Sequence, residues 1–204
     1  MKLRRTFPTA VVLIALVLAA PGALAADAQG FVKAKQTELT QLVKTSKTAA
    51  QDKKVEQAFD QVLDYDSLAQ ESLREFWKDL KPEEQKAFQE TLTKLVRGAY
   101  RKSLKKIGDY NVEYKGAAPA QAGQVVRTVA KSRSDAREEP VSVDYVVREQ
   151  AGSWRIVDIV TEGSSLVGNY RSQFRRIIKQ KNGIKDGFPE LLKRMKTRLE
   201  KGEA

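Results

Sequence analysis

The hydrophobic pattern of this chain changes its period once, close to Gly108. From Pro82 to Ile107, apolar residues recur three or four positions apart, which is typical of one buried face of an α-helix. Over residues 110–161, apolar and polar residues alternate in short runs, which is typical of half-buried β-strands. A long helix followed by consecutive strands predicts an α+β fold, with helices laid on one face of a single sheet.

The alternating region contains four strand-like runs separated by turn residues. The runs begin near Tyr110, Val125, Val141 and Trp154, and residues 116–123 between the first two form an Ala/Pro/Gly-rich loop. Short connections favour antiparallel pairing of neighbouring strands. We therefore predict a four-stranded antiparallel twisted sheet that packs on helices from both the N- and C-terminal segments.

Residues 154–174 join the last strand to a helix through a tight turn. Ser165 lies in this turn, where its hydroxyl can accept a hydrogen bond from an otherwise unpaired N–H at the start of the helix. Apolar residues then recur at helical spacing from Leu166. Because the turn is tight, the helix must fold back over the sheet. A pocket between the two apolar faces is one outcome and a filled core is the other, since periodicity does not distinguish them.

The first 25 residues have the three parts of a secretory signal peptide. Basic residues occur within the first five positions, an apolar run covers residues 7–20, and Ala23 and Ala25 fit the small-x-small cleavage rule. We expect cleavage after Ala25. An uncleaved membrane anchor is the alternative, but the apolar run is short for a transmembrane helix.

The remaining chain, residues 26–204, has the length of one domain. We predict helices over residues 26–108, the sheet over 109–162 and C-terminal helices over 165–200. The chain contains no cysteine, so its core must form without disulfides. The basic signal residues and the lack of other sorting signals indicate a bacterial periplasm.

The residue types exclude several kinds of catalytic site. The sequence contains neither His nor Cys, which excludes Ser-His-Asp and Cys-His nucleophiles and zinc sites built on those ligands. No Gly-rich phosphate loop and no metal-ligand cluster is visible. Glu162, Ser164 and Ser165 form a polar corner, which a turn and a helix cap explain more simply than an active site. We expect no enzyme activity, no metal and no cofactor.

Positive charge is concentrated at the C-terminal end. Residues 26–170 carry 23 basic and 22 acidic side chains, whereas residues 171–204 carry 11 basic and 4 acidic ones. This asymmetry is either a solvated helix face or a surface for something anionic: lipid phosphates, a membrane or an acidic protein. No nucleic-acid-binding motif is visible, so nucleic acid is not an expected partner.

Three segments carry motifs that occur together in one protein family. Residues 152–174 contain GSWRIVDI, EGSSL and NYRSQF, residues 140–145 read PVSVDY, and residues 64–100 carry a spaced set that begins with DY. In this order, after a signal peptide, they resemble the MlaC (toluene-tolerance) family of periplasmic phospholipid-binding proteins over nearly all of the mature chain. Two positions depart from the family: Arg74, where a Gly is usual, and Ser164, where many members have an aliphatic residue.

The resemblance implies a monomeric periplasmic lipid carrier. Such proteins carry glycerophospholipid between an outer-membrane lipoprotein–porin complex and an inner-membrane ABC transporter with an MCE-domain subunit, and so maintain outer-membrane lipid asymmetry. It also implies that the sheet and helices enclose an apolar cavity for the acyl chains, with the headgroup near its mouth.

On this hypothesis, particular side chains have particular roles. Those expected to line or adjoin the cavity are Tyr100, Leu104, Val143, Tyr145, Trp154, Ile156, Leu166, Tyr170 and Phe174. Those expected to attract a phosphate or an anionic docking surface are Arg171, Arg175 and Arg176. The alternatives are a carrier of a hopanoid-type lipid, a ligand-free periplasmic adaptor or chaperone, and an enzyme that uses the cavity.

Overall fold

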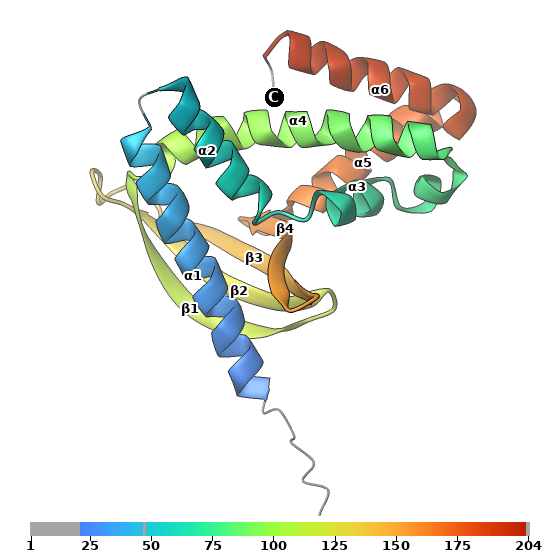
Figure 1. The fold of residues 1–204 in the computed structure, drawn as a ribbon. Helices are drawn as coiled ribbons and strands as arrows, with labels where there is room; N and C mark the ends of the chain where they lie inside the picture. Colours follow the sequence, from blue (N-terminus) through green and yellow to red (C-terminus); the bar gives the residue numbers. More distant parts are fainter. Residues whose placement is uncertain (1–20, 47, 203–204) are drawn as a thin grey trace, which may run out of the picture.

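The first half of the chain is helical. The computed structural model describes residues 21–46 and 48–202, apart from the side chains of residues 21–26 and 101–107, so most of the predicted signal peptide lies outside the described residues. Figure 1 shows the helices of this half beside and above the sheet. They are α1 (Pro21–Thr45), α2 (Ala49–Asp60), α3 (Tyr65–Leu73), the 3-10 helix η1 (Arg74–Asp79) and α4 (Pro82–Ile107).

An antiparallel sheet follows, with its strands paired in chain order. The strands are β1 (Tyr110–Ala120), β2 (Gly123–Ser132), β3 (Val141–Gln150), β4 (Ser153–Thr161) and β5 (Ser164–Ser165). The α+β class and the antiparallel meander are thereby confirmed, but the sheet has five strands and not four. The fifth strand pairs with the end of β4 through two residues. A strand of that length is too short to show an alternating pattern.

The loop predicted over residues 116–123 is wrong, because β1 continues through most of it. The strand ends at Ala120, and only Gln121 and Ala122 form the turn into β2. A bulge interrupts the pairing just before Gly116, whose φ of 105° favours glycine. Pro119 is compatible with pairing because β1 is an edge strand. Glycine and proline here mark an irregular edge strand, which resembles a loop in composition.

Two helices complete the fold, α5 (Leu166–Gln180) and α6 (Ile184–Glu200). A proline is typical of the first turn of a helix, but Pro189 lies inside α6 on an exposed face, five residues after the helix begins. The start of α6 packs closely on α5, because a Cβ added at Gly187 would lie only 2.5 Å from the Cα of Ile178. The two helices therefore cross in tight contact where a larger residue would not fit.

The fold separates into a helical core and a sheet covered by α1. Helix α5 packs on α3 and α6, and both α3 and α6 pack on α4. Their shared centre is Phe88, whose ring lies 5.5 Å from that of Phe174 and 6.3 Å from that of Phe188. Helix α1 instead packs against β1 and β2, on the other side of the molecule from α6 (Figure 1). None of the helices described is both long and apolar enough to cross a membrane.

The segment between α2 and α3 is fixed to the free edge of β4. Leu63 forms a parallel bridge with Ile156. The Ile156 N–H donates to the Val62 carbonyl at 2.8 Å, and the Asp64 N–H donates to the Ile156 carbonyl at 2.9 Å. This pairing covers the strand edge and holds the end of α2 beside the sheet.

Candidate functional site

A cavity of about 400 Å³ lies between the sheet and helices α1, α2 and α4. Side chains from both layers form its walls, and most of them are apolar. On the sheet side, Val143 and Tyr145 come from β3 and Ile156 from β4, on the same face of the sheet. Leu166 contributes the first residue of α5, directly after the tight turn. The last strand and the helix that follows it therefore both reach the cavity.

Five of the nine side chains predicted to line the cavity do so in the structure. They are Tyr100, Val143, Tyr145, Ile156 and Leu166. The side chain of Leu104 lies outside the described residues, although its backbone belongs to α4. Contact of these residues with a lipid stays a prediction.

The other three predicted lining residues lie elsewhere. Phe174 is 4% exposed in the helical core and packs edge-on against Phe88. Tyr170 stacks on Phe174 at 5.3 Å. The indole N–H of Trp154 donates to Asp27 at 2.9 Å. The apolar stripe of α5 turns away from the cavity after Leu166, because this helix packs mainly on α3 and α6.

The sequence prediction named residues of α4 at the wall opposite the sheet, but it missed the contributions of α1 and α2. The apolar lining residues it did not name are Val32, Leu39, Phe59, Val62, Ala99 and Ile159. Val32 and Leu39 lie seven positions apart, on one face of α1. Their helical spacing shows that this face is buried, but it does not show that α1 crosses the sheet above a cavity.

The few polar groups at the cavity are mostly bound to one another. The Lys35 ammonium lies 2.8 Å from Glu38, and the Tyr114 hydroxyl donates to the side-chain carbonyl of Gln36. Three hydroxyls differ: within the described part of the chain, those of Tyr100, Tyr145 and the exposed Thr161 have no hydrogen-bond partner. Burial raises the pKa of Tyr145 to about 12, and it raises the pKa of Tyr100 as well. Both side chains therefore remain neutral hydrogen-bond donors at physiological pH.

Comparison with known proteins identifies the family. A family model described as "MlaC protein" matches residues 32–197. The chain belongs to the MlaC family. The comparison with curated proteins gives no match.

A solved structure has the same fold as this MlaC-family chain. It is described as the phospholipid-binding protein from Ralstonia solanacearum in complex with a phospholipid. It is 23% identical in sequence and has a TM-score of 0.69, and the match covers 89% of this chain and 99% of that one. At this identity, the likeness establishes the fold.

The main departure from the MlaC pattern has a structural cost. Arg74, where the family usually has Gly, ends α3 with φ 48° and ψ −106°. Glycine adopts this backbone conformation readily, whereas a residue with a Cβ is strained in it. The departure therefore lies at the junction of α3 and η1, a position where backbone geometry favours the family's usual residue.

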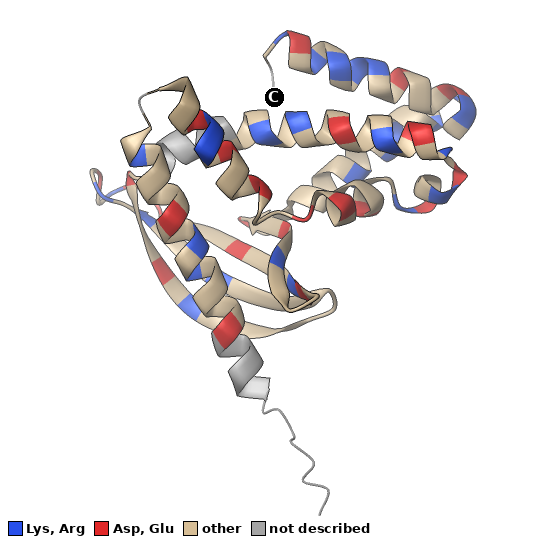
Figure 2. Ribbon diagram, viewed as in Figure 1, with Lys and Arg blue, Asp and Glu red and all other residues tan. Residues whose placement is uncertain are grey.

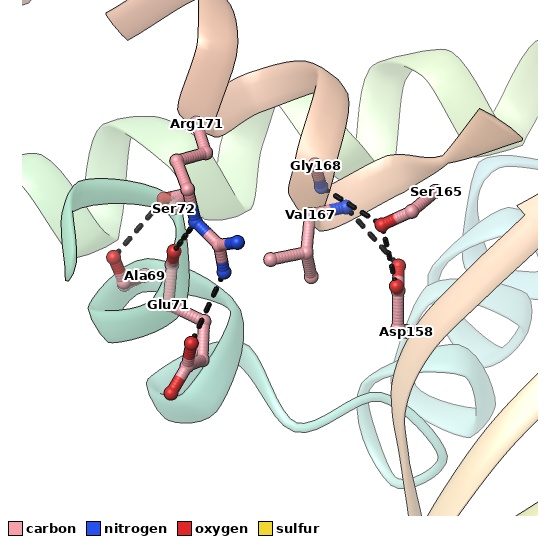
Figure 3. Close-up of polar contacts among 8 residues, drawn as sticks. All are labelled: Ala69, Glu71, Ser72, Asp158, Ser165, Val167, Gly168 and Arg171. Carbon is pink, nitrogen blue, oxygen red and sulfur yellow. Dashed lines mark hydrogen bonds and ion pairs between the residues drawn. The ribbon is translucent and has the colours of Figure 1, made fainter. Parts of the chain in front are cut away.

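The polar corner at Ser165 is a helix cap. Its hydroxyl accepts from the Gly168 N–H at 2.8 Å and donates to the Asp158 carboxylate at 2.6 Å (Figure 3). Asp158 also accepts from the Val167 N–H at 3.1 Å. Glu162 in turn accepts from the Ser142 N–H. These hydrogen bonds fix the start of α5, so the corner has a structural role.

A second hollow of about 540 Å³, which we call the polar groove, adjoins this corner. Val146 and Arg148 of β3 and Asp158 of β4 contribute to it, together with residues from α3, α5 and the β1–β2 turn. Because side chains alternate along β3, Val146 and Arg148 point away from the cavity that Tyr145 lines. The polar groove and the cavity therefore lie on opposite sides of the sheet.

Two of the three predicted arginines, Arg171 and Arg175, connect helices. The Arg171 guanidinium donates to the Glu71 carbonyl at 2.8 Å and pairs with the Glu71 carboxylate at 3.1 Å (Figure 3). Arg175 pairs with Glu75 at 3.3 Å, and Arg176 is exposed. Arg171 lines the polar groove and not the cavity. Figure 2 shows further Lys and Arg residues along α6, and a docking role for the basic surface stays a prediction.

A metal is not an evident occupant of either hollow. Among the residues described, no group of three or more His, Cys, Asp or Glu side chains is arranged to hold a metal ion.

Proposed function

We propose that this MlaC-family protein is a periplasmic carrier that binds the acyl chains of a glycerophospholipid in its cavity. The supporting observation is an apolar space of about 400 Å³ inside the fold. Protein interiors are normally packed with few voids larger than a water molecule. Apolar cavities tend to stay dry and take up apolar ligands. The relative from Ralstonia solanacearum, which is described as bound to a phospholipid, gives independent support for a lipid ligand.

The volume of the cavity limits how much of a lipid fits inside it. A water molecule occupies about 30 Å³ in the liquid, and a methylene group is of similar size, so the cavity corresponds to roughly thirteen methylenes. That is close to one acyl chain. A lipid with two buried chains therefore requires the cavity to widen. Helix α2 packs mainly on α1, so we propose that these two helices move together away from the sheet.

Energetics require such a carrier to exchange its lipid with a partner while docked. A two-chain lipid has about thirty methylenes, and each contributes about 0.8 kcal/mol on burial. The lipid would therefore not leave into water on a useful timescale. A docked partner can change the exchange only through its different affinity for the two states of the carrier. We propose that a monomer docks in turn with the outer-membrane lipoprotein–porin complex and the MCE-domain subunit of an inner-membrane ABC transporter.

The basic surface of α5 and α6 is the proposed docking site. Arg176, Lys179 and Lys181 are exposed at the end of α5. We propose that they attract an anionic partner or lipid headgroup, whereas Arg171 and Arg175 are already paired with acidic residues. The double variant R176E/K179E should keep its bound lipid but transfer it to partner complexes more slowly. Unchanged transfer would exclude this surface as the docking site.

Native mass spectrometry of the protein purified from periplasm tests the lipid proposal. We expect a bound mass of diacyl phospholipid size. Leu166→Glu or Tyr145→Glu should abolish it, because either substitution places a charge in the apolar cavity. Gln173→Glu is the matched control, since it adds the same charge on the exposed face of α5.

Other outcomes would support another class of function. A purified wild-type protein without bound mass favours an adaptor or chaperone. A bound mass without phosphorus favours a hopanoid-type lipid. Wild-type loading in folded Leu166→Glu and Tyr145→Glu variants would show that the lipid binds elsewhere.

A further inference from the structure

Two tyrosine hydroxyls beside the mostly apolar cavity have no partner among the described residues. Tyr100 comes from α4 and Tyr145 from β3, so they approach the cavity from the helical wall and from the sheet. In the described chain, neither hydroxyl has a hydrogen-bond partner. The hydroxyls of Tyr65 and Tyr114, by contrast, donate to Asp60 and Gln36. The fold therefore satisfies the hydroxyls of Tyr65 and Tyr114, but among the described residues it offers no partner to these two.

The accessible surface of the two tyrosines faces the cavity. Both side chains keep an intermediate exposure, yet burial raises the pKa of each, so protein surrounds them on most sides. Gln124 Oε1 and Arg148 Nε are the fully buried side-chain polar atoms without a partner among the described residues. The two phenol oxygens are not sealed in this way. Both tyrosines line the cavity, so accessible surface of each borders that space.

The two tyrosines line one space. Tyr100 belongs to α4 and Tyr145 to β3, and both contribute to the same cavity. Burial is the main cause of the raised pKa of each, so both hydroxyls stay protonated. The cavity thus has two neutral donors inside mostly apolar walls.

A polar group that is removed from water without a partner costs free energy, and a ligand acceptor removes that cost. The described lining contains one cation, Lys35, whose ammonium is already bound to Glu38 at 2.8 Å. A phosphate would be left without a free counter-charge here, and an isolated buried charge is very unfavourable. A neutral acceptor fits neutral donors better. In a glycerolipid, the neutral acceptors next to the acyl chains are the ester carbonyl oxygens.

We propose that the hydroxyls of Tyr100 and Tyr145 donate hydrogen bonds to the ester carbonyl oxygens of a bound glycerolipid. This inference rests on the proposed lipid-carrier function. It makes the two tyrosines specificity-determining residues. They position the glycerol end of the lipid, and they favour ester-linked lipids over lipids that lack a carbonyl, such as diethers and hydrocarbon-like lipids.

A competition between two synthetic lipids tests the proposal. The mature protein is incubated with vesicles that contain equal amounts of diester and diether phosphatidylglycerol with the same chain length, and the bound masses are measured by native mass spectrometry. We expect the wild type to prefer the diester, with each hydroxyl contributing about fivefold. Y100F and Y145F should each reduce the preference for the diester about fivefold, and the double variant should bind the two lipids equally. Phenylalanine keeps the ring and its packing, so the fold should persist.

The control is Y170F, because Tyr170 packs on Phe174 and does not line the cavity. It should keep the wild-type preference. Equal binding of both lipids by the wild type would overturn the hydrogen-bond proposal and leave the lipid-carrier function standing. A preference that persists in the double variant would also overturn it. If no folded protein binds either lipid, the carrier function itself fails.

Discussion

The two hollows of this molecule differ in what the chain has already done with their polar groups. The polar groove is the larger, at about 540 Å³ against about 400 Å³ for the cavity. In the polar groove, Asp158 accepts from Ser165 and Val167, and Arg171 is bound to Glu71. Arg148 Nε is the exception, a buried nitrogen without a described partner. In the cavity, apolar walls face an unfilled space.

This difference distinguishes polar groups that stabilise the fold from a space that can bind a ligand. A charged cluster whose members are paired within the chain gains little from a ligand, because binding would have to break existing hydrogen bonds. An apolar space gains from any ligand that covers its walls. The size of a hollow is therefore a poorer guide to function than the state of the groups around it.

The largest expected effect comes from removing the centre of the polar groove. Asp158→Ala deletes the acceptor for the Ile159 and Val167 N–H groups and for the Ser165 hydroxyl. We expect a loss of about 3 kcal/mol in unfolding free energy, because several groups lose their partner at once. Urea denaturation measures this loss. Lipid loading of the folded protein should not change, and a loss of loading at full stability would place function in the polar groove.

The pH dependence of stability should report on Asp64, whose carboxylate pairs with Arg148 of the polar groove. Burial alone would raise the pKa of Asp64, but hydrogen bonds from Ser67 and Gln150 and the charge of Arg148 outweigh it, so the pKa is lowered. A lowered native pKa stabilises the fold above the unfolded value of about 3.9, and that stability is lost as the pH falls further.

Asp64→Asn tests this assignment. We expect it to reduce the unfolding free energy by about 2 kcal/mol at pH 7, since hydrogen bonds to a charged acceptor are lost. The difference from the wild type should shrink as the pH falls from 5 to 3, as measured by urea denaturation at each pH. A difference that is the same at every pH would show that the Asp64 charge is unimportant.

Filling the cavity should stabilise the lipid-free protein, whereas the two substitutions above should destabilise it. Val143→Phe adds a ring toward the apolar space, where it can pack without displacing a neighbour. We expect lipid loading to fall about tenfold, equivalent to about 1.4 kcal/mol. The lipid-free protein should become more stable by up to about 1 kcal/mol, as cavity-filling substitutions often do. Native mass spectrometry and thermal unfolding measure the two effects, and unchanged loading would argue against this cavity as the lipid site.

The smallest effect concerns the strained residue beside the polar groove. Arg74→Gly restores the residue usual in the family at φ 48° and should raise the unfolding free energy by about 1 kcal/mol. The control is Lys78→Gly, an exposed change in the same 3-10 helix, at a residue whose φ is not positive. It should destabilise, because glycine adds freedom to the unfolded chain. Equal effects of the two substitutions would mean that Arg74 is not strained.

The sequence by itself determined the order and kind of the elements. The change of period at Gly108 predicted helices before strands, and short connections predicted the antiparallel meander. Ser165 was identified as a helix cap, and its hydrogen bond to Gly168 confirms this. These features depend on near neighbours in the chain, where backbone geometry and local hydrogen bonds decide the outcome.

Only the tertiary structure decided what each buried face packs against. Phe174 and Leu166 lie on one apolar stripe of α5, yet Leu166 lines the cavity and Phe174 fills the helical core. Val32 of α1 lines the cavity although its helical spacing shows only that its face is buried. Arg171 binds Glu71, which lies 100 residues away in sequence. Burial of apolar surface is non-directional, so a period shows that a face is buried without specifying its partner. Whether two packed elements enclose a cavity depends on how helices far apart in sequence cross, and no local sequence pattern predicts that crossing.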